Sequence, residues 1–237
     1  MDRAVLIDHV RDDSARLLAA QQESPHALAW EGLGWDRTQL LEHVAHVHAR
    51  IRAQLEAGPA ERIRFSEVPA PPGGDALART FSQGVDDLVH LLEEMDVAID
   101  WPTWAGQQPG TFFPRRMAQE MSIHRWDAVG GDIEAALAVD GVTELLELFA
   151  PRLPTERFGS TTGTLHLHAT DVEGEWLVQL GPDRVTFQLG HAKGDVALRG
   201  RASDLLLWAW NRAPVDDRFE VFGDLTLLGA WRTTVVF

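Results

Sequence analysis

The feature that most constrains the fold is a change of hydrophobic period at residues 151–154, Pro-Arg-Leu-Pro. Before it, apolar residues recur every three or four positions, as in amphipathic helices. After it, apolar and polar residues alternate in short runs separated by turn residues, as in strands joined by hairpins. The sequence therefore predicts an α+β protein of two domains. Residues 1–152 would form an antiparallel four-helix-type bundle, and residues 153–237 a small α+β domain with a mainly antiparallel sheet.

The predicted elements have clear boundaries. Asp36 followed by Gln39 resembles a capping box at a helix start, and the Gly58–Pro59 pair ends that helix. The segment 100–110 contains Pro and Gly and is predicted to be a loop. The predicted helices are residues 2–21, 36–56, 75–95, the stretch from Pro114 to Gly130, 132–149 and 202–210. The predicted strands are residues 164–170, 176–180, 185–189, 196–199 and 219–222.

Composition excludes several functions. The net charge of -15 disfavours nucleic acid and anionic membrane surfaces as partners, because both are bound through clustered Lys and Arg. The chain has no cysteine, which excludes disulfides, a cysteine nucleophile and cysteine metal ligands. The first residues lack the pattern of a signal peptide, and no apolar run is long enough to span a bilayer. We therefore expect a cytoplasmic protein.

The sequence also offers a candidate metal site. Glu120 and His124 are four residues apart, so a helix places them on one face, where they supply two of the three protein ligands of an open zinc-type site. Of three histidines upstream, His43 is the best inward-facing candidate, whereas His46 is predicted to be solvated and His48 to pack at an edge. The alternatives are a solvated Glu–His pair and a histidine that merely packs in the core.

Other histidines and acids have open interpretations. Asp127 follows His124 by three residues and could accept the free ring N–H of a metal-bound histidine, or instead cap or pair elsewhere. His166 and His168 alternate on one predicted strand and so point the same way. They could form a second metal pair, but an exposed strand face is the favoured interpretation. Trp35 and Trp126 are predicted to pack in the bundle.

Several of these segments carry a family resemblance. Residues 34–44, GWDRTQLLEHV, and residues 115–127, which end in the RWD triplet, resemble two signatures of the mycothiol-dependent maleylpyruvate isomerase family. The resemblance continues through residues 163–171, 196–200, 202–208 and 221–224, and so covers nearly the whole chain. It implies a DinB-like metal-binding bundle followed by a sterol-carrier-like α+β domain.

The resemblance also implies a site and a reaction. His43, Glu120 and His124 would bind zinc, or another divalent metal, with a fourth position open to water or a thiolate. Mycothiol would be the thiol cosubstrate: its thiolate adds to a double bond of maleylpyruvate, rotation follows, and loss of the thiol gives the isomer. Arg212, the nearest match to a family arginine, would be a catalytic residue that holds a substrate carboxylate; a solvated arginine at a helix C-terminus is the alternative.

The sequence therefore predicts a zinc-dependent enzyme that uses mycothiol, either a maleylpyruvate isomerase or a related thiol S-transferase. Its partners would be a small electrophilic substrate and a low-molecular-weight thiol. Two alternatives stay open. One is a carrier or binding protein for an apolar small molecule with a structural metal, and the other is a family member that has lost catalysis.

Overall fold

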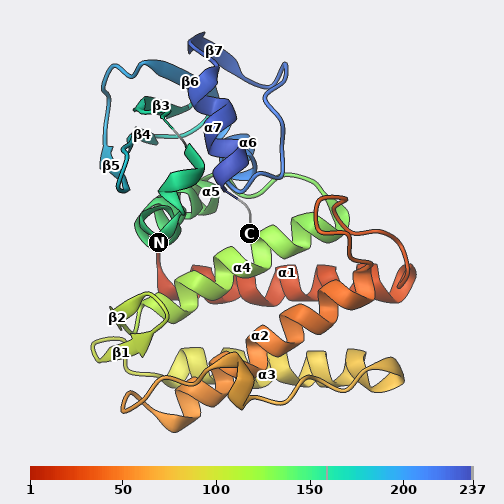
Figure 1. Ribbon diagram of the computed structural model, residues 1–237. Helices are drawn as coiled ribbons and strands as arrows, with labels where there is room; N and C mark the ends of the chain where they lie inside the picture. Colours follow the sequence, from red (N-terminus) through yellow and green to blue (C-terminus); the bar gives the residue numbers. More distant parts are fainter. Residues whose placement is uncertain (159, 236–237) are drawn as a thin grey trace. The chain divides into compact units, whose positions relative to one another are not determined.

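The computed structural model describes residues 1–158 and 160–235. The chain divides into two compact units, Met1–Gly131 and Asp132–Phe237, the first helical and the second built on a five-stranded sheet (Figure 1). This confirms the predicted α+β class with an antiparallel-dominated sheet. Within the described residues, no helix combines the length and the apolar character that crossing a membrane requires.

The first unit is a bundle of four long helices, and all four were predicted from the apolar pattern. Helix α1 packs against α4, α3 and α2, and α2 packs against α3 and α4 (Figure 1). The helices are α1 (Arg3–Glu23), α2 (Arg37–Ala57), α3 (Leu77–Glu94) and α4 (Phe112–Val129), with short 3-10 turns η1 (Phe65–Glu67) and η2 (Gly74–Ala76) between α2 and α3.

The two helices that carry the candidate metal ligands have well-defined ends. At the start of α2, Asp36 accepts a hydrogen bond from the Gln39 backbone N–H and the Gln39 side chain accepts one from the Asp36 N–H, which confirms the capping box. Gly58 caps the end of α2 with φ 84°, and Gly130 caps α4 with φ 68°, a backbone conformation that favours glycine. Both helices are therefore regular around their central residues.

The segment 100–110 differs from its prediction as a loop. It forms a hairpin of strands β1 (Asp100–Thr103) and β2 (Gly106–Pro109), with Thr103 paired to Gly106. Gly106 has φ 93°, and the Thr103 hydroxyl donates to its carbonyl at 2.8 Å. Pro and Gly indicate breaks in a sequence pattern, yet a two-stranded ribbon tolerates proline because each strand has an unpaired edge.

Helix α4 is buried on nearly all sides, and a buried ion pair joins it to α1. Arg125 Nε donates to Asp13 Oδ1 at 3.1 Å, and both side chains are less than a tenth exposed. Arg125 also donates through Nη1 to the Gly130 carbonyl at 2.7 Å, beyond the end of its own helix. The pair connects α1 to the helix that carries Glu120 and His124.

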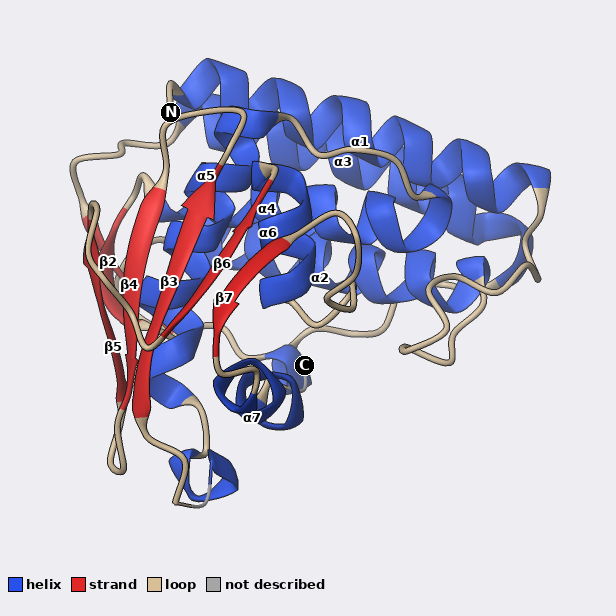
Figure 2. Ribbon diagram, turned by 90° about the horizontal axis from the view of Figure 1, so that it is seen from above, coloured by secondary structure: helices blue, strands red, loops and turns tan. Residues whose placement is uncertain are grey.

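The second unit is a sheet of order β5-β4-β3-β6-β7 covered by helices (Figure 2). All neighbouring strands are antiparallel except β3 and β6, which are parallel. Leu165, Leu167, Trp176 and Val178 are buried on one face, where Trp176 Nε1 donates to Thr143 of α5 at 3.0 Å. The strands are β3 (Gly163–Ala169), β4 (Glu175–Leu180), β5 (Val185–Leu189), β6 (Val196–Gly200) and β7 (Glu220–Gly223). The helices are α5 (Ala135–Glu144), α6 (Ala202–Ala209) and α7 (Thr226–Thr234), with a π-helical turn η3 (Leu145–Phe149) and 3-10 turns η4 (Ala150–Arg152) and η5 (Thr155–Phe158).

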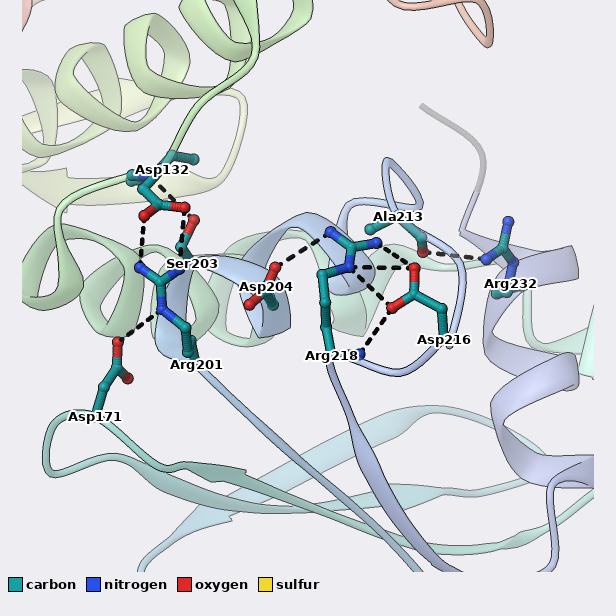
Figure 3. A network of polar contacts seen from close by, with 10 residues as sticks. Asp132, Asp171, Arg201, Ser203, Asp204, Ala213, Asp216, Arg218 and Arg232 are labelled. Atoms are coloured by element: carbon teal, nitrogen blue, oxygen red, sulfur yellow. Dashed lines mark hydrogen bonds and ion pairs between the residues drawn. The ribbon is translucent and has the colours of Figure 1, made fainter.

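The division between the units differs from the predicted boundary after residue 152, because α5 belongs to the sheet unit. Helix α5 packs on α6, and Ser203 of α6 accepts a hydrogen bond from the Ile133 N–H at 3.0 Å. Arg201 donates to both carboxylate oxygens of Asp132, at 2.6 and 3.2 Å, and also lies beside Asp171 (Figure 3). The helical period of residues 132–149 indicated a helix but not which core it joins.

We predict that Asp13→Ala destabilises the bundle by about 3 kcal/mol, because it removes the buried carboxylate that pairs with Arg125 Nε. Urea unfolding measures the loss. The matched control is Asp8→Ala on the same helix, whose partner Arg11 is largely exposed and whose removal should cost less than about 1 kcal/mol. An equal decrease in the free energy of unfolding in the two variants would show that the buried ion pair contributes no more to stability than the exposed one.

Candidate metal centre

Three side chains from two helices converge in the first unit. His43 comes from α2, and Glu120 and His124 come one turn apart from α4. Glu120 Oε1 lies 3.2 Å from His124 Nε2 and 3.6 Å from His43 Nε2, and the two rings meet edge to face at 5.1 Å between centroids. The three ligand atoms lie within 4.8 Å of one another. The structure thus brings together the three residues that the sequence proposed as ligands.

The second carboxylate oxygen of Glu120 is held by a residue that the sequence analysis did not assign. Arg116, one turn earlier in α4, donates through Nη2 to Glu120 Oε2 at 2.9 Å and is itself buried. Burial alone would raise the pKa of Glu120, but His124, His43 and Arg116 outweigh it and hold that pKa well below its usual value. The spacing of four between Arg116 and Glu120 was a usable signal, since such pairs face each other on a helix.

His124 lies between two carboxylates. Its Nδ1 is 2.9 Å from Asp127 Oδ2, in the contact that the sequence offered as one possibility for Asp127, while its Nε2 faces Glu120. Burial lowers the pKa of His124, but Glu120 and Asp127 raise it to about 9. Because Asp127 engages Nδ1, the Nε2 atom is the one directed at Glu120 and His43.

His43 forms the more open side of the cluster. Its side chain is 35% exposed, compared with 11% for His124. The Trp35 ring packs against it with 5.2 Å between centroids, so that Trp35, predicted only to pack in the bundle, flanks this cluster. Of the three candidate ligands, His43 is therefore the most exposed.

The other two histidines of α2 have separate environments. His46 is half-buried rather than solvated, and its Nε2 lies 3.0 Å from the Val68 carbonyl oxygen. His48, predicted to pack at an edge, is 1% exposed and stacks on Phe81 with 5.5 Å between centroids. Among the described residues neither ring nitrogen of His48 has a hydrogen-bond partner, and burial lowers its pKa to about 4.

Arg212 lies in the second unit, just after α6. It is 7% exposed, so the alternative of a solvated arginine does not describe it. Asn211, with φ 61°, reverses the chain, and the Arg212 N–H donates to the Leu207 carbonyl at 2.7 Å, while Nη1 donates to the Trp210 carbonyl at 3.1 Å. The guanidinium is thus held by its local turn.

The fold and the site define a two-domain α+β protein whose helical bundle gathers two imidazoles and a carboxylate at one point. The family model described as mycothiol maleylpyruvate isomerase N-terminal domain matches residues 7–129, and the one described as MDMPI C-terminal domain matches residues 136–230. The chain belongs to the mycothiol maleylpyruvate isomerase family.

Solved structures support the same fold. A crystal structure of a mycothiol-dependent maleylpyruvate isomerase is 16% identical, with a TM-score of 0.67 and 93% of each chain covered. A structure of a histidine-to-alanine mutant of such an isomerase is 15% identical, with a TM-score of 0.68 and the same coverage. No curated protein matches the chain. At this identity the likeness establishes the fold.

We predict that the bundle loses stability on acidification through His48. Its pKa is about 4 in the folded protein and about 6.5 when unfolded, so between these values the unfolded chain binds the extra proton. Stability contributed by this group is full above about pH 6.5 and falls, by an amount on the order of 3 kcal/mol, as the pH drops to 4. Denaturation of wild type and His48→Gln at pH 7 and pH 5 tests this: the variant should show the smaller pH effect, and identical pH effects would contradict the assignment.

Proposed function

We propose that the protein is a zinc-dependent enzyme that uses mycothiol as thiol cosubstrate, an isomerase of the maleylpyruvate type or a related thiol S-transferase. The observation that carries the proposal is the convergence of His43 Nε2, His124 Nε2 and Glu120 Oε1. Family membership supports the thiol and the reaction class.

The donor set fits a zinc-type ion. Two imidazole nitrogens and one carboxylate oxygen are a common catalytic zinc set, which leaves a fourth position for another ligand. In a tetrahedral site with bonds of about 2.0–2.1 Å, ligand atoms lie about 3.3 Å apart. The observed separations of 3.2 and 3.6 Å from Glu120 Oε1 bracket that value, so small side-chain adjustments suffice.

The surrounding residues suit this role. Arg116 occupies Glu120 Oε2 and thereby leaves Oε1 for the cluster, while Asp127 takes the Nδ1–H of His124 and orients its Nε2 inward. A divalent ion held there would supply the Lewis acidity that lowers the pKa of a thiol and favours the thiolate near neutral pH. The protein's part is to fix three donors in place and to leave the side toward His43 open.

Arg212 forms a separate part of the proposal. We propose that its guanidinium recognises a substrate carboxylate, which it can bind bidentately. Two observations support a positioned group: the side chain is buried, and the turn at Asn211 fixes its backbone. A buried guanidinium held in this way loses little conformational freedom when a carboxylate binds.

We predict that His43→Ala lowers zinc affinity and mycothiol-dependent isomerisation of maleylpyruvate, each by more than about a hundredfold, because one of three donors is lost. Elemental analysis after dialysis and a coupled absorbance assay are the measurements. The control is His90→Ala, since His90 is exposed on α3 and is not one of the clustered donors. Full zinc affinity in His43→Ala would refute the ligand assignment. Normal metal binding in wild type with neither isomerisation of maleylpyruvate nor thiol consumption, over a panel of electrophiles, would instead indicate a non-catalytic family member.

We predict that Arg212→Lys reduces kcat/KM for a carboxylate substrate by about tenfold to a hundredfold, mainly through KM, because lysine keeps the charge but loses the bidentate geometry. The same variant should react normally with an uncharged electrophile and bind zinc normally. A comparable loss for both substrates would point to a structural role, and no loss for either would show that Arg212 does not bind the substrate carboxylate.

A further inference from the structure

A second cluster of metal-binding side chains lies in the sheet unit, outside the site described above. His166 and His168 come from β3, Glu175 begins β4, and His191 follows the end of β5. Each offers one ligand atom, and these four atoms lie within 4.8 Å of one another. The sequence had placed His166 and His168 on one strand face, but His166 is buried, with only 7% of its side chain exposed, so the exposed face favoured by the sequence does not describe it.

The strand order explains why the four residues meet. The chain leaves the edge strand β5 and enters β6, so residues 190–195 must cross both β4 and β3 (Figure 2). Trp176 faces helix α5, and its neighbour Glu175 therefore faces the opposite side of the sheet, with His168 directly across on β3. The crossing connection passes on this side, because His191 contacts Glu175 there.

The connection is held close to the sheet at both ends. Gly190 has φ 102°, and its N–H donates to the Glu175 carbonyl at 2.9 Å, which turns the chain back over β4. At the far end, the carboxylate of Asp195 accepts hydrogen bonds from the Thr164 N–H and hydroxyl. A Cβ on Gly194 would lie 2.9 Å from the His166 backbone nitrogen, so only glycine fits there without a shift. These contacts fix the connection that carries His191 against the sheet.

The three imidazoles converge on a single oxygen. Glu175 Oε2 lies 2.8 Å from His166 Nε2, 3.2 Å from His168 Nδ1 and 2.7 Å from His191 Nδ1. One carboxylate oxygen has two lone pairs, so three ring nitrogens around it exceed what hydrogen bonding to that oxygen requires. The distances from Glu175 Oε2 to the three ring nitrogens are shorter than the roughly 3.3 Å between ligand atoms of a tetrahedral zinc site. A small outward movement of these side chains would accommodate an ion.

Charge and access also suit a cation. Glu175 contributes the one carboxylate among the four clustered donors. Arg199 is the register partner of His168 on β6, but its Nη1 donates to Glu220 at 2.8 Å, which offsets its charge. The His191 side chain is 78% exposed, so the cluster opens to solvent through the one ligand on a loop.

We propose that His166, His168, Glu175 and His191 form a second metal site, which binds zinc or a similar late first-row divalent ion. Three nitrogens and one oxygen match the borderline-soft character of such ions and complete a four-coordinate shell. The ion joins β3, β4 and the β5–β6 connection, and so stabilises the folded sheet unit in proportion to ion occupancy. The proposal does not depend on the function of the bundle site.

The test is zinc stoichiometry and stability of the full chain. Protein stripped with a chelator is dialysed against micromolar zinc chloride and analysed for bound zinc. Wild type should hold one more zinc per chain than the His168→Ala/His191→Ala double variant, and zinc should raise the melting temperature of wild type more than that of the variant. His90→Ala, with its exposed histidine, should behave as wild type.

Two further variants keep the outcomes distinct. His43→Ala should lose its own zinc and keep the one in the sheet unit, so failure of the bundle site leaves this proposal intact. His191→Ala removes only the exposed ligand, so the fold is kept, and it should weaken zinc binding at this site by about tenfold or more. Equal zinc content and equal melting shifts in wild type, His191→Ala and the folded double variant, checked by circular dichroism, would overturn the proposal.

Discussion

The first unit depends on keeping one carboxylate charged inside a helical bundle. Removing a lone carboxylate from water costs many kcal/mol unless opposite charges and hydrogen bonds replace the solvent. Helix α4 supplies these from its own sequence: Arg116 lies one turn before Glu120 and His124 one turn after it. His43 then meets the oxygen that Arg116 leaves available. The order of charges along one helix face therefore decides which carboxylate atom a cation can reach.

Because α4 is buried on nearly all sides, its polar residues contact different neighbours. Neighbouring residues point in different directions on a helix, so His124 contacts Asp127 and Glu120 while Arg125 reaches Asp13 on α1. One arginine thus attaches the helix to the bundle while the adjacent histidine faces the cluster. A packing change at Arg125 would be felt at His124 through the backbone that they share, because close-packed interiors transmit small shifts.

The sequence predicted what depends on local spacing. The capping box of Asp36 and Gln39, the shared face of Glu120 and His124, and the alternation in β3 are all set within a few residues.

The sequence did not predict features that depend on tertiary contacts. Helix α5 joined the sheet unit through Asp132 and Arg201, far apart in the chain, and the short helix α7 was not recognised. His48 and His43 lie on different faces of the same helix, and the sequence did not show that His48 would be buried against Phe81 while His43 stays half-open. Likewise, the period of β3 aligned His166 with His168, but Glu175 and His191 reach them only through strand order.

The two clusters differ in a way that bears on what a bound ion would do. The bundle offers three donor side chains, and a tetrahedral ion held by three keeps one position for an external ligand. The sheet unit offers four, which fill that shell and leave no position for a substrate. Under the proposed function, reactivity toward a thiol would therefore belong to the bundle, where His43 is the most exposed of the three donors. In the sheet unit the same kind of ion would act as a cross-link, since its ligands come from two strands and a connection that the strand order forces across them. Under the two proposals, donor count, more than ligand type, would separate a reactive role from a structural one in this chain.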